Sequence, residues 1–187
     1  PEDVKSIWAR IALGDAGALE GAVTALAEGL ALERGHAGHQ GREALVMAME
    51  IGHACAQSPG MGRRLMEDVT KGGETRASLL ALDGLAQALW TLGTAPQGLK
   101  DEAQSLRGDL HALARIQVEA RGELAITWGR LLGWTGPGDT TSLKGRLGLI
   151  ARTPEDHRHR LMAPLGCLGS HSQDCLKILL GPIQGEA

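Results

Sequence analysis

The stretch Ser58–Gly73, read as Ser-Pro-Gly-Met-Gly-Arg-Arg-Leu-Met-Glu-Asp-Val-Thr-Lys-Gly-Gly, contains one helix together with the signals for both of its ends. Ser58-Pro59 is a helix-start signal, because serine caps free backbone N–H groups and proline favours the first helical position. Apolar residues then recur every four positions and share one face of the helix: Met61, Leu65 and Val69. Gly72-Gly73 is expected to end the helix.

The same helical patterns continue on both sides of this stretch. Asp3 and Asp15 are expected to cap the first two helices, with a loop over residues 33–41 after them. Further helices are predicted within 43–57, 79–93, 96–113, 122–131, 140–150, 153–162 and 172–180, with a Gly/Pro loop at 133–139. The helix at 43–57 is apolar nearly all round, so we expect it to be the buried central helix.

Composition supports an all-α fold of about 9–10 short helices. The chain has no Phe or Tyr and only four Trp, and Ala, Leu and Gly dominate it. Strand formers are therefore scarce, whereas the best helix formers are abundant. Some of the 27 glycines fall inside helical patterns, where we expect them to let helices approach closely: Gly21, Gly52, Gly84 and Gly129.

Two small helical subdomains packed together are expected from the glycine-rich segments, which are the best hinge candidates. The N-terminal subdomain would cover residues 1–73, or extend to about 133, and the C-terminal subdomain would cover 74–187. No run of about 18 apolar residues occurs, so no membrane-spanning helix is expected. No signal peptide is visible, and three cysteines favour a reducing compartment.

Charge is unevenly distributed although the formal net charge is only −3. Residues 1–50 carry four basic and eight acidic residues, whereas 144–160 carry five basic and two acidic residues. Without Phe or Tyr, stacking of single-stranded bases is not expected, so basic residues would contact phosphates or anionic lipid headgroups. The candidate residues are Arg63, Arg64, Lys71, Lys144, Arg146, Arg152, Arg158 and Arg160. An ordinary solvated face is the alternative for each group.

No catalytic motif is assembled in the sequence, so we do not expect an enzyme. The best metal candidates cluster near the C-terminus: His157, His159, Cys167, His171 and Cys175. Their spacing does not fit a zinc finger, because there is no Cys-x-x-Cys pair and the first two histidines are only two positions apart. We therefore expect no cofactor, with zinc as the alternative.

The order of the short motifs resembles a known family. The series is Ser58-Pro59-Gly60-Met61-Gly62-Arg63-Arg64, Gly72-Gly73, Gly122-Glu123-Leu124-Ala125, Gly129-Arg130-Leu131, Thr140-Thr141, Gly145, Leu147, Ile150-Ala151 and His157-Arg158-His159-Arg160-Leu161-Met162. It resembles the matrix proteins of orthomyxoviruses, the influenza type, in order and approximate spacing over most of residues 4–162. A distant genus, such as the isaviruses or thogotoviruses, fits better than influenza itself.

This resemblance implies an all-helical protein that is not an enzyme. Members of the family self-assemble into a layer beneath the viral envelope, bind the anionic inner leaflet and the viral ribonucleoprotein or RNA, and drive assembly and budding. The implied location is the virion, and in infected cells the cytoplasm, the inner face of the plasma membrane and the nucleus. Arg63 and Arg64 match a basic helix that contributes to membrane or RNA contact, and His157 and His159 match paired histidines proposed as zinc ligands.

The chain departs from the family in three respects, the first being that it is shorter than the influenza proteins and lacks their net positive charge. Residues 76–93 are mostly Ala and Leu where the family has a highly basic helix, and Gly148 and Ala151 lie where it has paired cysteines. Two alternatives to a matrix protein therefore stay open. One is a cellular all-helical adaptor that binds a partner helix in an apolar groove. The other is a small metal-dependent enzyme.

Overall fold

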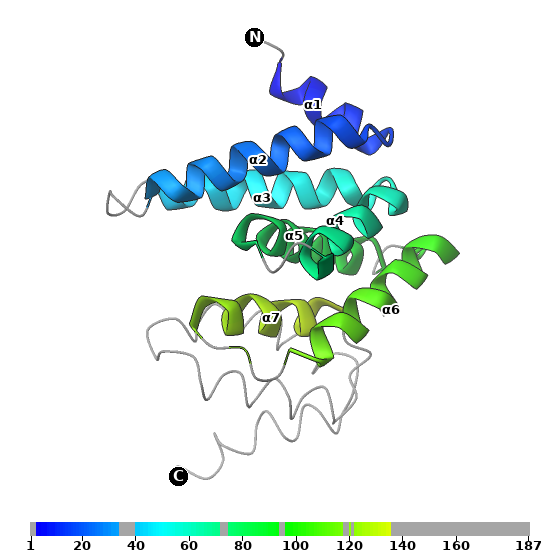
Figure 1. The fold of residues 1–187 in the computed structure, drawn as a ribbon. Coiled ribbons are helices and arrows are strands. Elements are labelled where there is room, and N and C mark those ends of the chain that lie inside the picture. Colours follow the sequence, from blue (N-terminus) through cyan, green and yellow to red (C-terminus); the bar gives the residue numbers. More distant parts are fainter. Residues whose placement is uncertain are drawn as a thin grey trace, which may run out of the picture. The chain divides into compact units, whose positions relative to one another are not determined.

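The computed structural model describes residues 3–33, 40–71, 75–93, 96–117, 120 and 122–135. These residues form helices only, without a strand, as expected (Figure 1). The helices are α1 (Val4–Ala12), α2 (Ala16–Glu33), α3 (Gln40–Ala56), α4 (Pro59–Lys71), α5 (Arg76–Gly93), α6 (Asp101–Arg115) and α7 (Gly122–Thr135). None of the described helices is long and apolar enough to cross a bilayer.

Local capping fixes the first two helices as expected. Asp3 is the N-cap of α1, and its side chain accepts a hydrogen bond from the Lys5 N–H. The Asp15 carboxylate accepts from the Ala18 N–H at 3.1 Å, and its other oxygen pairs with Arg10 at 2.8 Å. Between the helices Gly14 has φ +93°, a left-handed conformation that suits glycine and allows the chain to turn sharply.

The most buried helix is α5, and not α3 as expected. Residues 77–86 of α5 are buried without interruption, because α2, α3 and α4 all pack against this helix. In α3, by contrast, Leu45 and Val46 are exposed although they are apolar. The apolar pattern at 43–57 therefore marks a helix with one buried face and one exposed face, on which Leu45 and Val46 lie beside charged side chains.

The contact between α3 and α5 is made without side chains at two glycines. A Cβ added to Gly52 would lie 2.6 Å from the Ala81 carbonyl oxygen and would overlap the backbone of Gly84 and Leu85. A Cβ added to Gly84 would lie 2.9 Å from the Ala48 carbonyl oxygen. The expected close approach is thus confirmed at Gly52 and Gly84. It is wrong at Gly21, where an added Cβ meets nothing within 4 Å.

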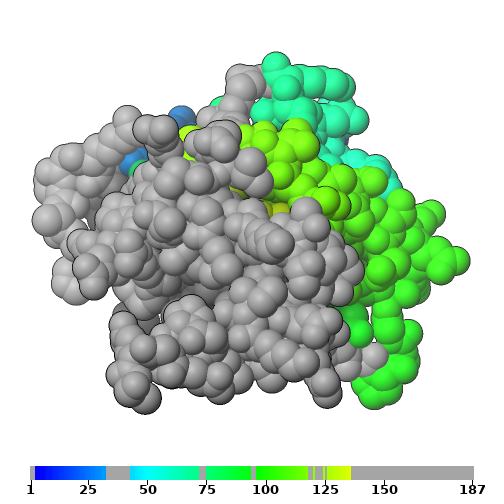
Figure 2. Space-filling view, turned by 90° about the horizontal axis from the view of Figure 1, so that it is seen from below, coloured from blue at the N-terminus to red at the C-terminus, as the bar shows by residue number. Residues whose placement is uncertain are grey.

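Several helix boundaries differ from the expected ones, most clearly the start of the sixth helix and the end of the seventh. The sixth helix begins at Asp101 rather than at Pro96, because Pro96 and Gln97 form a turn and Gly98 takes φ +63°. The exposed side of α6 is visible in green in Figure 2.

Gly133 lies inside α7 rather than in a loop, since this helix continues to Thr135. The Thr135 hydroxyl donates a hydrogen bond to the Leu131 carbonyl oxygen at 2.7 Å.

The chain divides into two compact units, residues 1–107 and 108–187. This division falls inside α6, between the two boundaries considered from the sequence. The first unit holds α1–α5 and the start of α6. In the second unit the buried His111 ring lies 3.3 Å from the Thr135 hydroxyl, which joins α6 to α7. The helices expected after residue 140 lie outside the described residues.

We predict opposite effects for alanine at two helical glycines. Gly52→Ala should destabilise the protein by about 1–3 kcal/mol, because its Cβ meets backbone atoms that cannot move without separating α3 from α5. Gly21→Ala should stabilise the protein by about 0.5–1 kcal/mol, because it removes a flexible residue from a helix and meets open space.

Urea denaturation followed by circular dichroism measures both changes. Equal stability of the two variants would contradict the account of the α3–α5 contact.

Candidate phosphate-binding surface

The arginines of α4 are directed outward by the packing of the glycine before them. Gly62 is buried, and a Cβ there would lie 2.6 Å from a methyl group of Leu106. Because Gly62 faces inward, the next two positions turn away from the core, and both Arg63 and Arg64 are exposed. Arg63 is anchored, since its Nη2 donates to Ser105 Oγ of α6 at 3.1 Å.

Two carboxylates, which were not among the predicted site residues, lie on the same helix as these arginines. Lys71 Nζ donates to Glu67 Oε2 at 2.8 Å, and this hydrogen bond lowers the pKa of Glu67. Partial burial raises the pKa of Asp68, against the opposing charge of Arg64. The helix therefore carries three basic and two acidic side chains, and its surface is only weakly positive.

A groove of about 1030 Å³ runs between α2 and α4 beside these residues. Its lining mixes apolar and charged side chains, including Glu20, Arg64 and Asp68. The Glu20 charge also contributes to the raised pKa of Asp68. Arg63 and Arg64 together can bind a phosphate group by charge and hydrogen bonding, but the neighbouring carboxylates make a single such contact weak.

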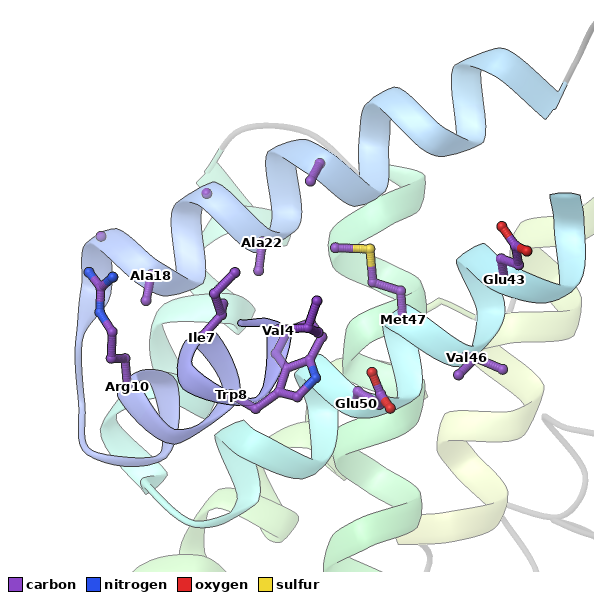
Figure 3. Close-up of a pocket in the computed structure, with 13 residues that line it drawn as sticks. Val4, Ile7, Trp8, Arg10, Ala18, Ala22, Glu43, Val46, Met47 and Glu50 are labelled. Atoms are coloured by element: carbon purple, nitrogen blue, oxygen red, sulfur yellow. The ribbon is translucent and has the colours of Figure 1, made fainter. Parts of the chain in front are cut away.

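A second groove, of about 770 Å³, lies between α1, α2 and α3 and is mainly apolar (Figure 3). Ile7 and Trp8 of α1, Ala22 of α2 and Met47 of α3 face it. None of the described site residues predicted from the sequence lines this groove. A signal for it was present, because Gly17, Gly21, Ala25 and Gly29 recur every four residues and form a stripe of small residues on one face of α2.

The other predicted site residues lie outside the described part of the chain. These are Lys144, Arg146, Arg152, Arg158, Arg160, His157, His159, Cys167, His171 and Cys175. Within the described ranges no group of three or more His, Cys, Asp or Glu side chains is close enough to hold a metal. The structure therefore brings together Arg63, Arg64 and Lys71 from the predicted set.

Comparison of the chain with protein-family models, with curated proteins and with solved structures found no match. The resemblance to matrix proteins therefore rests on the order of its short motifs alone. Two landmarks of that series coincide with helix starts in the structure. Pro59 is the first residue of α4, and Gly122 is the first residue of α7.

Cys55 of α3 should be chemically inert in the folded protein. The side chain is fully buried, and desolvation raises the pKa of its thiol to about 12, so almost no nucleophilic thiolate exists at about pH 8. We predict that N-ethylmaleimide leaves Cys55 unmodified in the native chain and modifies it in concentrated guanidinium chloride.

Peptide mapping by mass spectrometry reads this site separately from Cys167 and Cys175. Native-state modification of Cys55 at the rate of an exposed thiol would show that α3 opens readily, contrary to this packing.

Proposed function

We propose that this protein is a structural protein of the orthomyxovirus matrix type. It assembles into a layer under the viral envelope, adheres to anionic membrane and binds the viral ribonucleoprotein, without catalysis. The observation that carries the proposal is the geometry of the Gly62-Arg63-Arg64 motif. Its glycine packs inward against Leu106, and both arginines are directed to solvent on one helix.

Adhesion of this kind depends on many weak contacts. A single α4 surface is only weakly positive, because Glu67 and Asp68 offset part of its charge. When identical subunits are held in a layer, however, multivalent attachment raises the effective affinity by about 10²–10⁴. Weak single sites therefore suit a protein that must attach as an assembly and detach as separate subunits.

Assembly itself is proposed to use the uneven charge of the chain. Residues 1–50 have a net charge of −4 and residues 144–160 a net charge of +3. An acidic surface on one subunit that meets a basic segment on the next gives a head-to-tail contact. Such a contact is not closed by symmetry, so it can propagate.

We predict that the chain co-sediments with vesicles containing phosphatidylserine, but not with neutral phosphatidylcholine vesicles, at low salt of ~0.05 M. Arg63→Gln/Arg64→Gln should lower the affinity by about 10- to 30-fold, since each basic residue near an anionic surface contributes about 1 kcal/mol. The matched control is Lys5→Gln/Arg115→Gln, which removes the same charge at exposed positions on α1 and α6.

The opposite change tests the role of the carboxylates. Glu67→Gln/Asp68→Asn should strengthen vesicle binding, and a fall in pH should act in the same direction, because partial burial raises the pKa of Asp68 and this group therefore loses its charge at a higher pH than an ordinary aspartate. Equal losses in the arginine variant and in the control would refute a role for α4, and binding to neutral vesicles would refute the electrostatic proposal.

For assembly, charge reversal by Arg158→Glu/Arg160→Glu should weaken self-association and reduce its dependence on salt. Sedimentation velocity over a range of protein concentrations measures the change. Unaltered self-association in this variant would count against the head-to-tail contact.

A further inference from the structure

The apolar groove between α1, α2 and α3 extends along α2. Beyond its main part it continues into a hollow of about 240 Å³, and the two share Ala25, Glu43 and Met47. The stripe of Gly17, Gly21, Ala25 and Gly29 follows the same course. Its ends are about 18 Å apart, because a helix rises about 1.5 Å per residue. The groove can therefore accommodate about three turns of a helix.

Gly21 and Gly29 of this stripe are not required by the fold of the chain. An added Cβ at Gly21 or Gly29 would meet nothing within 4 Å, whereas one at Gly52 or Gly84 would overlap backbone atoms. Glycine destabilises a helix, and at these positions a side chain would project into open space. Glycine therefore has no role here in the packing of the free subunit. Small residues spaced by four on a helix allow a second helix to approach closely, which accounts for the stripe.

Apolar side chains at the groove are exposed in the chain by itself. Val4 of α1 is 55% exposed and Val46 of α3 is 52% exposed, and Trp8 is only half-buried. Contiguous exposed apolar surface of this kind is typical of an interaction site rather than of a free surface. The groove therefore has the composition of one half of a helix–helix interface.

The charged residues that line the groove determine which helix fits. Arg10 is paired with Asp15, so it contributes little net charge. Glu43 and Glu50 of α3 are exposed, and neither has a hydrogen-bond or ion-pair partner among the described residues. They lie seven residues apart on one face of α3, about 10.5 Å along its axis. An occupant with two basic residues two turns apart can pair with both.

We propose that this groove is the docking site for a basic amphipathic α-helix of a partner polypeptide. Its apolar face packs on the small residues of α2 and between Trp8 and Met47. Lysine or arginine residues seven positions apart on its flank pair with Glu43 and Glu50. The proposal does not rest on membrane adhesion, since the groove and the basic surface of α4 use different residues.

The test uses the full chain and a fluorescently labelled synthetic helix of about 16 residues. The helix has leucines at helical spacing on one face and lysines seven positions apart on its flank. A second peptide has glutamates in place of the lysines, with the same leucines. We expect fluorescence anisotropy to show saturable binding of the basic peptide, and binding of the acidic peptide that is at least about tenfold weaker.

Two variants of the chain separate charge from shape. Glu43→Gln/Glu50→Gln should weaken binding of the basic peptide by about 3- to 30-fold and reduce its salt dependence. Glu28→Gln/Glu102→Gln removes the same charge at exposed positions outside the groove and should leave binding unchanged. Gly21→Leu fills the open space above α2 and should abolish binding, while circular dichroism confirms that the variant remains helical.

Several results would overturn the proposal. Equal binding of the two peptides, or full binding to the Gly21→Leu variant, would exclude the groove as the site. Self-association that Gly21→Leu abolishes, without binding of the basic peptide, would identify the occupant as a second copy of this chain. Binding of a fatty acid in the groove that the peptide does not displace would identify an apolar small molecule instead.

Discussion

The backbone contact between α3 and α5 is the constraint on which the first unit depends. Gly52 and Gly84 bring the two helices so close that backbone atoms of one occupy the place of side chains on the other. This approach allows α5 to be buried along ten consecutive residues, with α2 and α4 also packed against it. The protein has no Phe or Tyr, and the buried apolar residues described in the first unit are Ala, Leu, Ile, Val and Cys. The core of this unit is therefore filled by close helix packing rather than by large aromatic side chains, whereas Trp128 is fully buried in the second unit.

Short-range signals in the sequence predicted the helix starts well. Asp3, Asp15 and Pro59 act on backbone groups within one turn, so their effect does not depend on the rest of the fold. Pro96 failed as a start signal. Gly98 takes a left-handed conformation two residues later, and nothing local distinguishes a proline in a turn from one in the first turn of a helix.

Burial was harder to predict than helix position. Leu45 and Val46 are as apolar as the residues of α5, yet they are exposed. A hydrophobic pattern shows that a face can be buried, but only the packing of other helices decides whether it is.

The charge of the candidate site was also harder to predict than its basic residues. Arg63, Arg64 and Lys71 were identified from the sequence, but the pairing of Lys71 with Glu67 was missed, although their spacing of four residues on one helix is a signal for such a pair.

The helix α2 forms a wall of both grooves. Glu20 and Thr24 on one side face α4, and Gly21 and Ala25 on the other side face α1 and α3. A rigid helix cannot move toward one groove without widening the other, so an occupant that displaces α2 alters the affinity of the opposite site. Thermodynamic linkage makes such an effect reciprocal. If an occupant of the apolar groove changes the affinity of the charged groove by some factor, an occupant of the charged groove changes the affinity of the apolar groove by the same factor.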